Sequence, residues 1–131
     1  MRVTSKNGDC LSIERIEIDA QRVGIQLGIQ IRQGDFAGAA RVWVQVREWE
    51  RFVDALTRLE TDRQGEAVVE AMSPGELLLK VRATDRLGHV AVEGLVGQRG
   101  GERTTALSFS AIDFDPTLLP DVLRAAREIA R

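Results

Sequence analysis

The first part of the chain alternates hydrophobic and polar residues with a period of two, the pattern of strands with one buried face. Residues 23–31 are the most regular, with glycine and glutamine separating the apolar positions Val23, Ile25, Leu27, Ile29 and Ile31. In residues 10–19, Leu11 and Ile13 share one phase, and Ile16 and Ile18 share the other. This phase change at Glu14–Arg15 predicts a β-bulge or a bend.

The middle of the chain changes from strand to helix periodicity. Residues 34–39 (GDFAGA) are typical of a loop, and Val42, Val44 and Val46 then predict another alternating strand. From residue 47 the apolar positions recur at spacings of three and four, which predicts an amphipathic helix with Gly65 as its stop signal. The apolar stripe of this helix comprises Trp49, Phe52, Val53, Leu56 and Leu59.

Four further strands follow, at residues 66–72, 76–84, 89–97 and 103–112. The segments between them are short and turn-like (SPG, DRLG and QRGG), so successive strands are expected to form hairpins. A final helix begins near Pro116 and carries the apolar residues Leu118, Leu119, Val122, Leu123, Ala126 and Ile129.

About eight strands and two helices in this order predict an α+β fold. Most connections are too short for parallel crossovers, so the sheet should be mainly antiparallel. We expect a strongly bent sheet or an open sandwich that packs on the two helices. No linker or low-complexity stretch divides the 131 residues, which predicts a single domain over residues 1–131.

Composition and charge exclude several classes of function and location. The net charge is −2 and the cations form no basic stripe, which argues against a nucleic-acid-binding protein. No apolar run is long enough to span a membrane, and the first residues lack the apolar stretch of a secretory leader. The single cysteine, Cys10, is typical of a reducing compartment, so we expect a cytoplasmic protein in which Cys10 is a buried small residue.

Asp113 and Asp115 form the most site-like cluster, because paired carboxylates can hold a metal ion or perform acid–base chemistry. Asp115 is followed by Pro116, and aspartate followed by proline is also a favoured start of a helix. Since no further ligand or acid accompanies the pair in the sequence, we predict that Asp115 caps the final helix.

Other candidate residues have simpler interpretations. His89, the only histidine, follows Gly88 in a predicted turn and has no evident zinc or triad partner. The glycine-rich segment 94–102 (GLVGQRGGE) precedes a strand, which favours a hairpin tip over a phosphate-binding loop. Trp43 falls on the face opposite Val42 and Val44, where it belongs either to a second core face or to an exposed interaction patch. We therefore assign no catalytic, cofactor-binding or metal-binding residue and expect no cofactor.

Three segments in this order resemble the WapI-like family of small bacterial immunity proteins, namely residues 48–60, 65–97 and 107–129. The matching motifs are the strand entry Gly88-His89-Val90 and the step Asp115-x-Thr117-x-Leu119 that opens the last helix. Relatives tend to have glutamine where this chain has Pro116. The similarity is strongest from about Val42 to Ile129.

The resemblance implies a non-enzymatic protein that neutralises a cognate protein toxin by binding it, as a monomer or weak homodimer. The contacting residues are not evident from the sequence. The alternative is a small-ligand-binding or regulatory domain that uses the pocket of a bent sheet.

Overall fold

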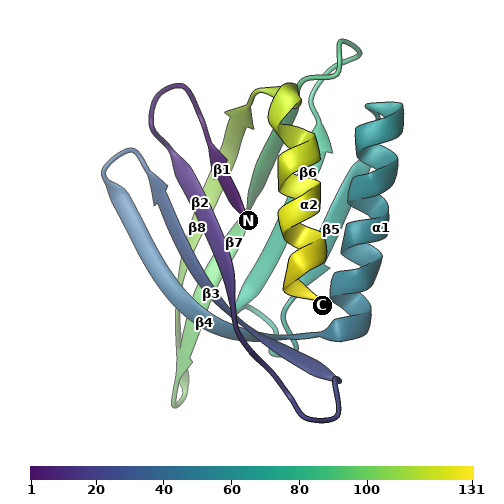
Figure 1. Ribbon diagram of the computed structural model, residues 1–131. Helices are drawn as coiled ribbons and strands as arrows, with labels where there is room; N and C mark the ends of the chain where they lie inside the picture. Colours follow the sequence, from purple (N-terminus) through teal and green to yellow (C-terminus); the bar gives the residue numbers. More distant parts are fainter.

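The computed structural model describes residues 1–131 and contains two four-stranded antiparallel sheets and two α-helices (Figure 1). The N-terminal sheet consists of β1 (Arg2–Thr4), β2 (Cys10–Ile18), β3 (Gly24–Gln33) and β4 (Phe36–Gln45), paired in that order. The C-terminal sheet consists of β5 (Glu66–Glu70), β6 (Leu77–Ala83), β7 (Val90–Gly100) and β8 (Arg103–Phe114), also in chain order. Helix α1 (Val46–Asp62) connects the sheets, and the short 3-10 turn η1 (Pro116–Leu118) leads into α2 (Leu119–Ile129). This confirms the predicted α+β fold with an open arrangement of antiparallel sheets.

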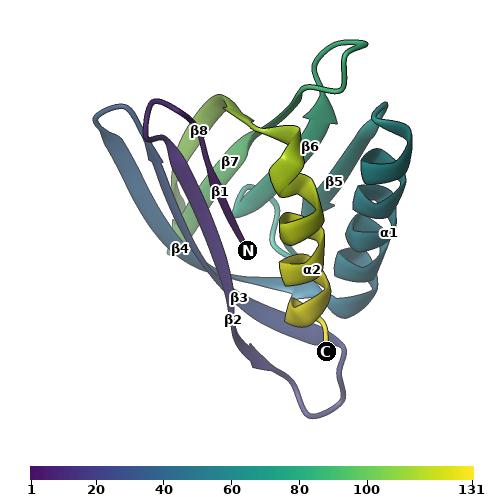
Figure 2. The ribbon, with the colours of Figure 1, turned by 45° about the horizontal axis from the view of Figure 1, so that its top comes forward.

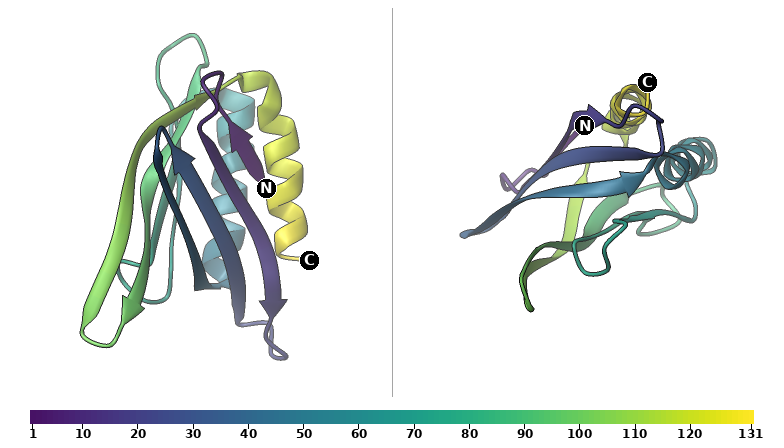
Figure 3. Two further views of the ribbon diagram at one scale, coloured as in Figure 1. Left: turned by 90° about the vertical axis from the view of Figure 1, so that its left-hand side faces the viewer. Right: turned by 90° about the horizontal axis from the view of Figure 1, so that it is seen from below.

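The two sheets face each other, and α1 and α2 lie side by side along one side of the space between them (Figures 2 and 3). Both sheets and both helices contribute to one cluster of 31 buried hydrophobic residues. No polar or charged side chain is buried. The interior is therefore filled by apolar side chains alone, and polar chemistry is confined to the surface.

The alternation in the sequence determines which side chains enter this core. Ile25 lies opposite Val44 and Leu27 opposite Val42, and all four side chains are fully buried. The predicted bulge in β2 is confirmed, because Arg15 pairs with Leu27 and Glu17 with Gln26, which leaves Ile16 as the extra residue. Ile16 lies on the outer face, 43% exposed.

Three details of the predicted first sheet are wrong. Val23 precedes β3 and is exposed, because β3 begins at Gly24. The segment 34–39 is not a loop: only Gly34 and Asp35 form the turn, and β4 starts at Phe36. Val46 begins α1 and does not end the strand. In β4, pairing with β3 along ten residues overrides the weak strand preference of its alanines and glycine.

The predicted buried stripe of α1 is confirmed, with Val53 only partly buried. Its predicted end at Gly65 is wrong by two positions. Arg63 adopts the left-handed conformation (φ 57°) and its N–H donates to the carbonyl of Leu59, so Arg63 closes the helix. Gly65 instead provides the positive φ of the turn into β5.

The predicted hairpin is confirmed, because β7 and β8 pair as far as Gly100 and Arg103, but its tip is only Gly101–Glu102, and Gly94, Gly97 and Gly100 lie within β7. Gly94 sits at an irregularity of that pairing, where a Cβ atom would lie 1.9 Å from the carbonyl oxygen of Leu78. The glycine is therefore required by a close backbone approach, and no phosphate-binding role is needed to explain it.

The C-terminal end of α2 is held by three side chains from other elements. The indole N–H of Trp49 donates to the carbonyl of Ala126 at 2.8 Å, and Trp49 is fully buried. Arg15 donates to the carbonyls of Ile129 and Arg131, and Arg22 donates to that of Ala130 at 2.9 Å. These donors satisfy carbonyls that a helix end leaves without intrahelical partners, and the two cations complement the helix dipole.

The two tryptophans provide a matched test of this contact. Trp49→Phe should destabilise the protein by about 1–3 kcal/mol, because the buried carbonyl of Ala126 loses its donor. Trp43→Phe should cost less than about 1 kcal/mol, because the Trp43 indole makes no hydrogen bond and is only half-buried. Urea melts of both variants measure the difference. Equal losses in the two variants would show that the Trp49–Ala126 bond does not hold the helices together.

Candidate functional site

A polar groove lies where three connecting segments meet at one end of the molecule, the upper end in Figure 1. The segments are the β1–β2 loop, the β6–β7 loop and the junction between β8 and α2. The groove has a volume of about 850 Å³. It brings together the candidate residues His89, Asp113 and Asp115 with Lys6, Asp9 and Asp85.

Asp85 and His89 form a hydrogen-bonded side-chain pair at the entrance to β7. Nδ1 of His89 lies 2.5 Å from Oδ2 of Asp85, and the other carboxylate oxygen accepts the backbone N–H groups of Leu87 and His89. The hydrogen bond from His89, followed by those backbone bonds, lowers the pKa of Asp85 below its ordinary value. Both side chains are exposed, so the pair closes a surface turn, as predicted for His89.

Asp115 starts the C-terminal helical segment. Its Oδ1 accepts the backbone N–H and the hydroxyl of Thr117, both at 2.9 Å. These bonds lower the pKa of Asp115, with a smaller contribution from the positive charge of Lys6. The predicted capping role is confirmed with one refinement: Asp115 caps η1, and α2 itself begins at Leu119 without a side-chain cap.

The β1–β2 loop forms the third wall of the groove. The hydroxyl of Ser5 donates to the side-chain carbonyl of Asn7 and accepts the backbone N–H of Asp9 at 3.1 Å. The carboxylate of Asp9 accepts the N–H of Gly34 at 3.0 Å and thereby ties this loop to the β3–β4 turn. Asp113 lies exposed between these loops, and its carboxylate makes no hydrogen bond or ion pair.

The hydrogen bonds in the polar groove hold its loops in shape. Ser5 is bonded to Asn7 and Asp9, and His89 is bonded to Asp85, so hydroxyl and imidazole are not linked as nucleophile and base. No group of three or more His, Cys, Asp or Glu side chains is arranged to hold a metal ion.

The other two candidate residues lie on the outer face of the N-terminal sheet. Cys10 is half-buried there, and its neighbour Leu11 points into the core, so the expectation of a buried cysteine is wrong. Trp43 is also half-buried. A Cβ atom at Gly24 would lie 3.1 Å from the Trp43 ring and 3.0 Å from the Met72 methyl, so both side chains lie over this glycine.

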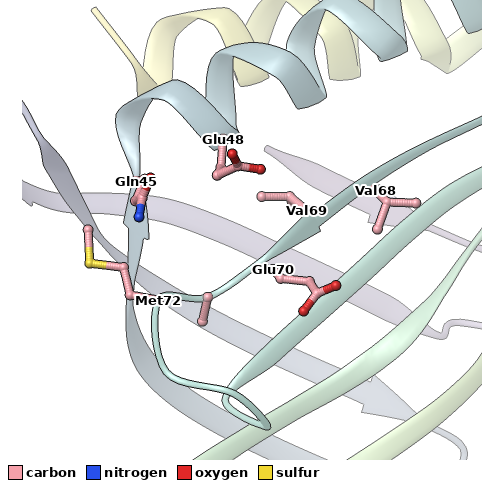
Figure 4. Close-up of a pocket in the computed structure, with 7 residues that line it drawn as sticks. Gln45, Glu48, Val68, Val69, Glu70 and Met72 are labelled. Carbon is pink, nitrogen blue, oxygen red and sulfur yellow. The ribbon is translucent and has the colours of Figure 1, made fainter.

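A second groove, the edge groove, was not predicted from the sequence. It lies between the first turn of α1 and strand β5 and has a volume of about 490 Å³ (Figure 4). Its lining residues are Gln45, Glu48, Val68, Val69, Glu70, Ala71 and Met72. One signal was present in the sequence, since the adjacent valines of EAVVE must place one apolar side chain on each face of the strand.

The interior of this α+β fold is apolar, and its polar side chains and grooves lie on the surface. A model of the Immunity protein WapI-like family matches residues 2–131, and the chain therefore belongs to this family. The match includes the N-terminal strands. Comparisons with curated proteins and with solved structures give no significant match. Neither helix is both long and apolar enough to cross a membrane.

The hydrogen bonds of Asp115 predict a specific response to acid. Because its pKa is lowered by folding, its contribution to stability is complete above the ordinary carboxylate value of 3.8 and is lost as the pH falls from there through the folded pKa. Asp115→Asn should match the wild type in thermal melts at neutral pH, since asparagine caps equally well, and should lose less stability below about pH 4.

Asp115→Ala is the control and should melt a few degrees lower at neutral pH. A wild-type melting temperature for Asp115→Ala at neutral pH would contradict the capping role.

Proposed function

We propose that the protein neutralises a cognate protein toxin in the cytoplasm by binding it directly, without catalysis. The family match over residues 2–131 carries this proposal, because an immunity protein can protect by covering a surface of its toxin. A standard interface buries roughly 1,600 Å² in total, about 800 Å² from each partner. The accessible surface of this chain, 7767 Å², readily provides such an area.

The composition of the interior supports surface binding over the small-ligand alternative. A ligand pocket needs a few polar groups to orient its ligand. Because no polar or charged side chain is buried, the space between the sheets offers none. In the polar groove the serine and the histidine are bonded within separate loops, which supports a role without nucleophilic catalysis.

Titration of toxin activity separates binding from catalysis. A binding protein should abolish the activity of its toxin at about one molecule per molecule of toxin and should leave the toxin covalently unchanged. The toxin domains to test are those encoded beside this gene, first by co-expression and rescue of growth, then as purified proteins. Neutralisation by a small fraction of an equivalent, or a change in toxin mass, would show that the protein is an enzyme.

A further inference from the structure

Strand β5 has an open edge with a complete set of unpaired backbone groups. The N–H of Ala71 donates to Leu77 at 3.0 Å, and the N–H of Ala83 donates to Gly65 at 3.1 Å. Since alternate residues of an antiparallel strand bond to the same neighbour, residues 65, 67, 69 and 71 face β6. The N–H and C=O groups of Glu66, Val68 and Glu70 therefore point away from the sheet, and β5 pairs with no other strand.

The other sheet edges are shorter or partly occupied. β1 has three residues. The edge of β8 is blocked at Ser110, where the side-chain amide of Gln33 both donates to and accepts from the backbone at 3.1 and 3.0 Å. The edge of β4 meets the chain just beyond β5 at Trp43, whose carbonyl accepts the N–H of Met72 at 2.8 Å, so this bond also ends the open edge of β5 at Glu70. Proteins usually protect long open edges in such ways, because an open edge pairs readily with another chain.

The edge groove runs beside the open edge of β5 and supplies side-chain contacts. Figure 4 shows the carboxylates of Glu48 and Glu70 on either side of the apolar side chains of Val68 and Val69. Val68 is 37% and Met72 is 43% exposed, and Met72 continues the apolar surface to Trp43. Glu70 makes no ion pair and no lysine or arginine lines the groove, whereas Glu48 is paired with Arg51 at 2.7 Å. The groove is therefore complementary to apolar and basic side chains.

We infer that the partner docks an extended segment, with alternating apolar and basic side chains, as an added strand on the edge of β5. Its backbone would bond to the outward groups of Glu66, Val68 and Glu70, which gives affinity. Its side chains would meet Val68, Met72 and the unpaired carboxylate of Glu70, which gives specificity. This inference rests on the proposed function, since it identifies where the toxin binds.

Val68→Pro tests the backbone contact. Proline removes an N–H that points outward, and it leaves the bonds to β6 intact because position 68 makes none. Affinity for the toxin domain that the wild type binds should fall by about tenfold or more. Val68→Thr is the matched control: it keeps the N–H and the β-branched shape, and should bind within a few-fold of the wild type.

Glu70→Lys tests the contribution of the Glu70 carboxylate. It also provides a second test of the β5 edge if Val68→Pro does not fold. It should also weaken binding about tenfold or more, because it replaces the unpaired carboxylate with a cation. Asp113→Lys makes the same change at an unpaired carboxylate in the polar groove, at the opposite end of the molecule, and should bind like the wild type. Binding is measured by calorimetry against the inactivated toxin domain, with a thermal melt of each variant.

The outcomes separate the two claims. Loss of affinity in the folded β5 variants, with wild-type binding in both controls, supports the added strand. Wild-type binding by Val68→Pro and Glu70→Lys would overturn the added strand and leave the proposed function standing. Equal loss in Glu70→Lys and Asp113→Lys would also overturn it, because the effect would then be one of net charge. Failure of the wild-type protein to bind any of the toxin domains would overturn both.

Discussion

Helix α1 must pack against both sheets and against α2 at once, and the rest of the structure depends on this requirement. It contacts β4, β5, β6 and α2, with Trp49, Phe52, Leu56 and Leu59 almost completely buried. Trp49 adds the one directional contact in this stripe, because its indole N–H binds the carbonyl of Ala126 in α2. A helix that connects two sheets and also holds the C-terminal helix places all layers around one apolar core.

The position of α1 also explains the exposed edge. The helix follows β4 directly and covers the inner side of β5, where Ala67 and Val69 are buried. The outward backbone groups of β5 lie beside the first turn of α1. The edge groove lies between this turn and β5 (Figure 4). The bond from Met72 to Trp43 then brings the apolar surfaces of the two sheets together. A structural requirement of the core thus creates a continuous surface that suits a protein partner.

The sequence predicted the parts of the fold that depend on periodicity. The stripe of α1, the alternation of β3 and the bulge at Ile16 follow from which positions are apolar. Its errors arose where pairing overrode local preference, as for Phe36–Ala39, or where an arginine took a left-handed conformation that glycine usually takes, as for Arg63. Local signals could not reveal these outcomes because a neighbouring strand or the preceding helix decides them.

Local sequence signals also predicted only part of the candidate sites. The capping role of Asp115 is a local property, so it could be read from Asp-Pro-Thr. The polar groove depends on three loops that are distant in the chain, and the edge groove depends on how α1 lies beside β5. The pairing of Asp85 with His89 could have been predicted, since they are only four positions apart, but the turn geometry that joins them appears only in the fold.

The open edge of β5 is tested most directly by backbone amide hydrogen exchange. The exchange is monitored by NMR in the free protein and in its complex with the toxin domain. In the free protein the amides of Val68 and Glu70 should exchange fast, while that of Ala67, bonded to β6, is protected. In the complex, Val68 and Glu70 should become protected and Ala67 should stay so. Unchanged fast exchange at Val68 and Glu70 in a saturated complex would contradict an added strand on this edge.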